Sequence, residues 1–148
     1  MIDYNKFYLV SFDVAKALKD LQYSEETLHH YLYDGNEAKA ISFGSPKKSL
    51  KIKNYETFNA PTQGYLIREL RDKYKILVIT EPLKSNTFEG VRYGFSIFDL
   101  NPKLGKNDWV LVDYFTDSKK YYERQEDAID AGLIEGLTIL KRRGIIWE

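Results

Sequence analysis

The chain has 148 residues, of which 43% are hydrophobic and 30% are charged, a balance typical of a globular domain rather than a disordered segment. Lys plus Arg and Asp plus Glu number 22 each, and the resulting net charge of +0 argues against a protein built chiefly to neutralise nucleic acid. The absence of Cys excludes a disulfide framework, catalysis by a thiolate and a zinc site with Cys ligands.

A helix and a hairpin are predicted near the start of the chain. After a short apolar run at 7–10, Ser11 is placed to cap a helix over 12–21. The buried face of this helix is predicted from the helical spacing of Val14, Ala17, Leu18 and Leu21. Two strands at 28–33 and 38–43 then flank the turn signal Asp34-Gly35.

Residues 44–59 lack clear hydrophobic periodicity. The segment is polar and basic, and it opens with the sequence Gly44-Ser45-Pro46, which breaks the preceding strand pattern. We expect a long loop with at most one short strand at 50–53. A loop of this length in a compact domain is either functional or mobile.

A second helix and a meander of strands are predicted between residues 59 and 122. Pro61 and Thr62 open the helix, and its buried face is formed by Leu66, Ile67, Leu70 and Tyr74. The unbroken apolar run at 76–80 is typical of a central strand covered on both faces, and Pro82 is expected to end it. Strands at 91–97 and 109–115 and a short edge at 121–122 follow.

The last helix is predicted over 125–143. Acidic residues in its first turns and basic residues in its last turn complement the helix dipole, and Leu133 and Leu137 are expected to be buried. Gly144 is placed for a left-handed stop, with Ile145 folding back on Leu140.

Taken in order, these elements predict an α+β fold, with a mainly antiparallel sheet packed by about three helices in a single domain. No apolar run approaches the roughly 18 residues of a membrane-spanning helix. No apolar signal core follows Met1. We therefore expect a cytoplasmic protein without a membrane segment.

No residue pattern in the chain predicts a catalytic, metal or cofactor site. His29 and His30 are adjacent, so on a strand they point to opposite faces and cannot form one site unless the strand bulges. The carboxylates near the last strands could bind magnesium, but turns and strand edges explain them as well: Asp99, Asp108, Asp113 and Asp117. Phosphate-binding glycine loops and the nucleophile motif G-x-S-x-G are absent. Together, these observations favour a protein that is not an enzyme.

One segment is basic enough to suggest binding. Four lysines lie close together near Tyr55: Lys47, Lys48, Lys51 and Lys53. Lysines of this kind can follow a phosphate backbone while an aromatic ring stacks on bases. A solvated hairpin tip explains the same residues, and the balanced net charge favours that interpretation.

The aromatic residues suggest a second surface. On the predicted strand 28–33, Tyr31 and Tyr33 share one face, and Trp109 begins a later strand. An exposed aromatic sheet face is typical of a partner site, and a homodimer would hide it. The alternative is that a helix or the 44–59 segment covers this face within one chain.

Three segments together resemble a group of small proteins encoded by gut bacteria, their prophages and mobile elements. They are F-D-V-A-K-A-L-K-D-L at 12–21, N-A-P-T at 59–62 with R-D-K-Y-K-I at 71–76, and Y-Y-E-R-Q-E-D-A-I-D-A-G-L-I-E-G-L at 121–137. The shared residues are helix starts and helix faces, so the resemblance implies a fold and not a chemical activity. The resemblance does not extend over residues 44–59. The leading hypothesis is a non-enzymatic interaction protein, an accessory factor of a phage or mobile element. The alternative is a nucleic-acid-associated protein that uses Lys47–Lys53.

Overall fold

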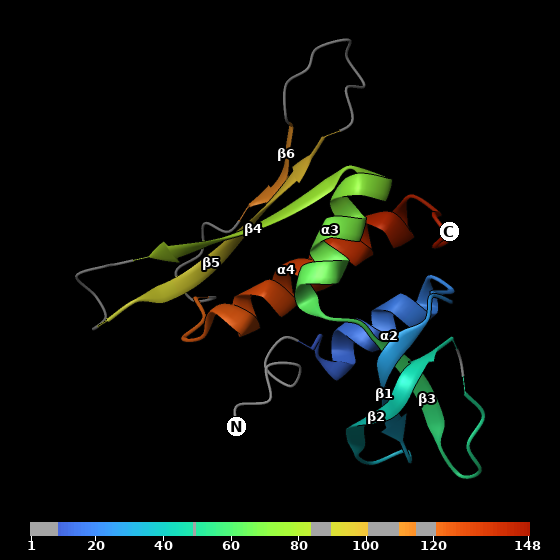
Figure 1. The fold of residues 1–148 in the computed structure, drawn as a ribbon. Helices are drawn as coiled ribbons and strands as arrows, with labels where there is room; N and C mark the ends of the chain where they lie inside the picture. Colours follow the sequence, from blue (N-terminus) through green and yellow to red (C-terminus); the bar gives the residue numbers. More distant parts are fainter. Residues whose placement is uncertain (1–8, 49, 84–89, 101–109, 115–120) are drawn as a thin grey trace. The chain divides into compact units, whose positions relative to one another are not determined.

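The computed structural model of the chain describes residues 9–48, 50–83, 90–100, 110–114 and 121–148 (Figure 1). The helices are α2 (Phe12–Asp20), α3 (Gln63–Tyr74) and α4 (Gln125–Arg142). The strands are β1 (Thr27–Tyr33), β2 (Ala38–Lys47), β3 (Glu56–Ala60), β4 (Ile76–Leu83), β5 (Arg92–Asp99) and β6 (Val110–Tyr114).

Within these residues the strands form two antiparallel three-stranded sheets, in the orders β2-β1-β3 and β4-β5-β6. The predicted α+β class, with antiparallel strands and three helices, is confirmed, although the strands divide into two sheets rather than one. The chain groups into two compact units, residues 1–63 with 137–148 and residues 64–136. That the whole chain is one domain stays a prediction.

In the first unit, α2 begins and ends through specific backbone contacts. The Ser11 hydroxyl accepts a hydrogen bond from the Val14 N–H at 3.3 Å, which confirms the predicted N-cap. At the other end, Gln22 adopts a φ of +62° and its N–H donates to Lys19, while the Tyr23 N–H donates to Leu18. Glycine usually adopts this left-handed conformation at the end of a helix. Here Gln22 adopts it, and the sequence did not predict this.

The sheet of the first unit is more extensive than the sequence suggested. β2 continues to Lys47 and β3 begins at Glu56, so only residues 48–55 connect the two strands instead of a loop over 44–59. Most of β2 is exposed, since it is an edge strand, and it therefore lacks the apolar alternation that reveals a half-buried strand. Around the Asp34-Gly35 turn, the Asp34 carboxylate accepts the N–H groups of Asn36 and Glu37, both at 2.8 Å.

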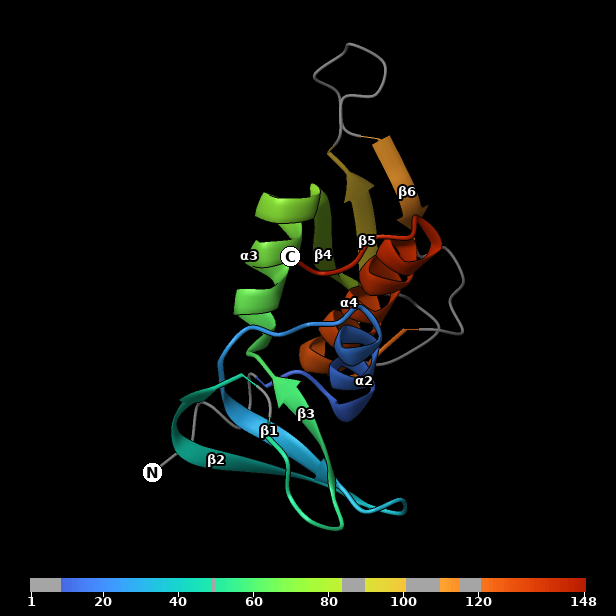
Figure 2. The same cartoon turned by 90° about the vertical axis from the view of Figure 1, so that its right-hand side faces the viewer.

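In the second unit, Figures 1 and 2 show α3 and the first turns of α4 on the same side of the β4-β5-β6 sheet. Among the strands that the structure describes, β4 pairs only with β5, so it lies at the edge of this sheet and is not the central strand predicted. Pro82 lies inside β4 opposite Tyr93, because proline is tolerated where no neighbouring strand needs its N–H. The predicted edge at 121–122 is an isolated bridge between Tyr122 and Tyr93.

Two glycines bring α4 close to β4. A Cβ added to Gly132 would lie 2.6 Å from Val78 Cγ1, whereas one added to Gly136 would meet Ile76, Leu70 and Val78 at 3.5–3.6 Å. Leu133 and Leu137 are buried, as predicted, and so is Leu140. The helix ends as predicted, with Gly144 at φ +69° and the Ile145 N–H donating to Leu140 at 3.0 Å.

Candidate binding surface

The predicted lysines lie on and beside a short turn between β2 and β3. Lys47 is the last residue of β2, Lys48 follows it, and Lys51 and Lys53 are exposed in the connection. The Tyr55 N–H donates to the Ile52 carbonyl at 3.1 Å, and Asn54 takes the left-handed conformation that closes this turn. We call residues 50–55 the basic hairpin.

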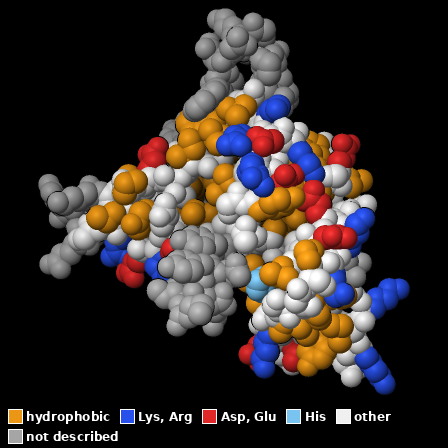
Figure 3. Space-filling model, viewed as in Figure 1, with side chains coloured by type: hydrophobic (Ala, Val, Ile, Leu, Met, Phe, Trp, Pro, Cys, Tyr) orange, Lys and Arg blue, Asp and Glu red, His pale blue; other side chains and the backbone are white. Residues whose placement is uncertain are grey.

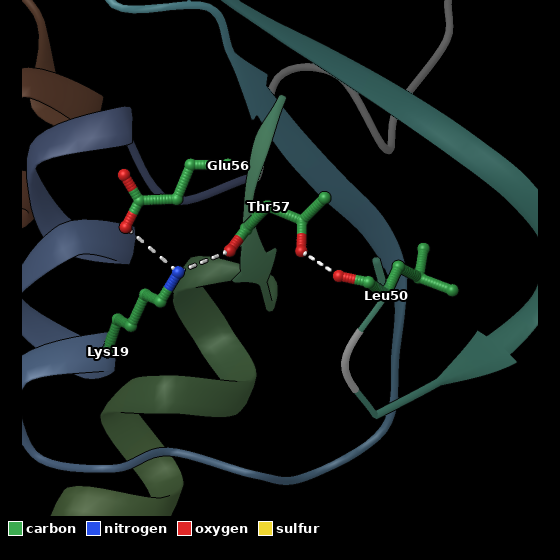
Figure 4. A network of polar contacts seen from close by, with 4 residues as sticks. All are labelled: Lys19, Leu50, Glu56 and Thr57. Atoms are coloured by element: carbon green, nitrogen blue, oxygen red, sulfur yellow. Dashed lines mark hydrogen bonds and ion pairs between the residues drawn. The ribbon is translucent and has the colours of Figure 1, made fainter. Parts of the chain in front are cut away.

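The basic hairpin is tied to β3 by side chains that sequence reasoning did not single out. The Thr57 hydroxyl donates to the Leu50 carbonyl at 2.6 Å (Figure 4). The Asn59 amide donates to the carbonyls of Glu25 at 2.9 Å and Lys47 at 3.3 Å, and it also contacts the Lys48 carbonyl. These contacts hold both ends of the connection, and side chains of Lys or Arg project from the region of β2 and β3 in Figure 3.

Lys19 of α2 joins the same region, although it is 37 residues from its partner Glu56. Its ammonium lies 3.0 Å from a Glu56 carboxylate oxygen and donates to the Thr57 carbonyl at 3.0 Å (Figure 4). It also lies 4.4 Å from the centre of the Phe58 ring, which attracts a cation. The sequence shows only a solvated helix position at Lys19, so no sequence signal could have predicted these contacts.

Two adjoining hollows lie at this surface, and both are lined by Lys19, Leu50, Lys51 and Thr57. The inner hollow has a volume of about 280 Å³ and is completed by Ala15, Leu18, Tyr23 and Asn59. The outer hollow has a volume of about 420 Å³ and is completed by Ile52, Lys53, Tyr55 and Glu56. Tyr55 is 46% exposed, so its ring is accessible at the rim.

The tyrosines proposed as a partner site lie elsewhere. The Phe12 ring of α2 packs against Tyr31 and Tyr33, with ring centres 5.6 Å and 5.1 Å apart. The Tyr31 hydroxyl also donates to the Val10 carbonyl at 2.6 Å. This face of the sheet is therefore covered by a helix of the same unit, which is one of the two alternatives given above for the aromatic face. Trp109 lies outside the described residues.

The histidines occupy different environments. His30 is fully buried, with its Nε2 atom 3.0 Å from the Thr27 carbonyl oxygen and its ring 5.3 Å from the Phe43 ring. Burial lowers the pKa of His30, and interactions with the backbone of Thr27 and Lys47 act in the opposite direction. His29 is half-buried. Of the candidate carboxylates, Asp99 is buried at the end of β5, whereas Asp108 and Asp117 lie outside the described residues.

Comparison of the chain with family models, with curated proteins and with solved structures found no match. Among the described residues, no group of three or more His, Asp or Glu side chains is arranged to hold a metal ion. In the same residues no helix is both long and apolar enough to cross a membrane. What the described surface does offer is a set of lysines and an accessible tyrosine around two hollows.

Proposed function

We propose that this chain is a non-enzymatic binding protein, an accessory factor of a phage or mobile element. Its contact surface is the basic hairpin with Lys47 and Lys48, and its partner is an acidic segment of another protein. The observation that carries the proposal is the exposure of four lysines on and beside a connection that is tied to β3 through Lys48 and Leu50. The location expected from the sequence, the cytoplasm, stays a prediction.

The anchoring of the hairpin matters because it reduces the entropy lost on binding. A lysine on a free loop loses backbone as well as side-chain freedom when it meets a partner, whereas here the Thr57 and Asn59 contacts already hold the backbone. Clustered charges of one sign also increase the rate of encounter with a partner of opposite charge. Leu50 and Tyr55 add apolar area beside the charges, which suits a protein segment that mixes acidic and apolar residues.

A second candidate is single-stranded nucleic acid. Tyr55 is exposed next to the lysines of the hairpin, and an accessible ring between cations is what stacking on an unpaired base requires. Glu56 at the same surface would repel phosphates and carboxylates alike. The protein partner is favoured instead by the balanced net charge of the chain, since a nucleic-acid-binding protein usually carries a basic excess.

The first prediction separates these candidates by fluorescence anisotropy with two labelled probes, a peptide of alternating Glu and Leu and a 20-nucleotide thymidine strand. We expect the peptide to bind more tightly, with an affinity that falls as salt rises, because exposed charges are screened. Changing Lys47, Lys48, Lys51 and Lys53 together to Ser should weaken peptide binding by about tenfold or more, the scale of a few lost charge contacts.

The matched control removes the same charge elsewhere, by changing Lys16, Lys39, Lys73 and Arg142 to Ser. These residues are exposed and do not line either hollow. An equal loss in both variants would mean that only net charge matters and would refute the proposed surface. Tighter binding of the thymidine strand, lost in the first variant alone, would replace the acidic partner with nucleic acid.

A further inference from the structure

We propose that the inner hollow, which shares Leu50 and Lys51 with the basic hairpin, binds a small organic carboxylate with an apolar body. The floor of the hollow is apolar, since Ala15 and Leu18 line it from α2 and Leu50 lines it from the start of the hairpin. Its volume of about 280 Å³ is near the lower end of the range for small-molecule sites, so it suits a ligand of one or two rings.

The charge at the hollow selects an anion. Lys19 and Lys51 both line it, and the lining includes no carboxylate. An acidic group on the ligand would meet the two lysines, while its apolar body would cover the apolar floor. The polar and the apolar part of the ligand would thus each contact a different part of the hollow. A neutral molecule of the same shape would leave the cations without a new partner and would gain less on binding.

The protein already shows how a carboxylate sits at Lys19. The Glu56 carboxylate lies 3.0 Å from the Lys19 ammonium (Figure 4), and Glu56 lines the outer hollow but not the inner one. The side chains of this pair are 46% and 56% exposed, and exposed pairs of this kind contribute little to stability. A ligand carboxylate can therefore take the place of Glu56 without a large loss.

Two further contacts keep the ammonium in place when Glu56 leaves. Lys19 also donates to the Thr57 carbonyl at 3.0 Å and lies over the Phe58 ring. The cation is thus positioned for an incoming anion before the anion arrives, which reduces the cost of ordering the side chain on binding. Glu56 acts as an internal competitor for the same ammonium.

The second prediction is tested by titrating the isotope-labelled full chain with 2-naphthoate and, separately, with neutral 2-naphthamide, followed by NMR. We expect the carboxylate to shift the amide signals of residues that line the inner hollow and to bind severalfold more tightly than the amide, the scale of an exposed ion pair. Lys19→Met keeps the apolar stem and should reduce this preference, leaving only the contribution of Lys51. Lys16→Met, on the same helix but outside the hollow, should leave the preference unchanged.

Glu56→Gln tests the competition directly. It should raise the affinity for 2-naphthoate severalfold, whereas Glu37→Gln, an exposed change at the β1–β2 turn, should not. The proposal is overturned if naphthoate and naphthamide bind alike, if Lys19→Met retains the full preference, or if Glu56→Gln leaves the affinity unchanged. These changes affect exposed side chains, and thermal melts of each variant check that the fold is kept.

Discussion

At the scale of a single residue, His30 makes the fold sensitive to acid. Its ring is fully buried and its Nε2 atom faces the Thr27 carbonyl, so the neutral ring with a proton on Nε2 satisfies this contact. Burial disfavours the charged form and lowers the pKa below its ordinary value. His29 is only half-buried, and the degree of burial of each histidine depends on packing that a local sequence pattern does not contain.

The third prediction follows from the sign of this pKa shift. Above the unfolded-state pKa of about 6.5, the His30 ring is neutral in both the folded and the unfolded chain. In that range His30 therefore adds no pH dependence to the free energy of unfolding. Below that value the unfolded state binds a proton more readily than the folded state, and stability falls as the pH falls toward the folded-state pKa. Urea unfolding at pH 7.5 and at pH 5.5 should show a loss of stability at the lower pH.

The matched variants are His30→Gln and His29→Gln. The first should reduce the difference between the two pH values, because the residue that titrates is gone, and the second should retain most of it. If only His29→Gln removes the difference, the buried ring is not the source. Should His30→Gln fold poorly, the pKa of His30 can be measured by NMR in the unaltered chain, and a value at or above 6.5 would contradict the argument.

At the scale of elements, helices were easier to predict than strands. α2 and α4 lie within a residue of their predicted bounds, because their apolar spacing, the Ser11 cap and the Gly144 stop are local signals. β2 was predicted too short, since an exposed edge strand carries no apolar alternation. The strand position of Pro82 depends on which side of β4 has a neighbour, and that is decided by distant residues.

The fourth prediction concerns the packing of α4 on the second sheet. Gly132→Ala should destabilise the protein, because its new Cβ would come within 2.6 Å of Val78 Cγ1 and force the helix or strand to move. Gly136→Ala should be neutral or stabilising by up to about 1 kcal/mol, since Ala favours helix and the available contacts are ordinary. Denaturant melts of the two variants measure both free energies of unfolding.

These two glycines control for each other, because both lie in the interior of α4 and both changes improve helix propensity equally. Equal stabilisation by the two changes would contradict the close approach of Gly132 in α4 to Val78 in β4. Equal destabilisation would mean that Gly136 is as tightly packed as Gly132. The sequence shows the glycines but not the difference between them.

At the scale of the whole molecule, the candidate surface was only partly predictable. The lysines of the basic hairpin stand together in the sequence and were found there. Lys19 was not found, because its contact with Glu56 joins residues 37 positions apart and depends on how α2 packs near β3. The alternating strand pattern placed Tyr31 and Tyr33 on one face but could not show whether a helix covers that face.

The fifth prediction concerns self-association through that aromatic face. Phe12 of α2 covers it, in ring contacts with Tyr31, Tyr33 and Phe58 at 5.0–5.6 Å. We expect light scattering at micromolar concentration to show no dimer that depends on Tyr31 or Tyr33. Phe12→Ala removes the cover and should expose apolar area, which raises self-association, whereas Phe12→Leu keeps an apolar cover and should not. A dimer of the unaltered chain that is lost on changing Tyr31 and Tyr33 to Ser, with the fold intact, would show that α2 moves away and that this face is an interface after all.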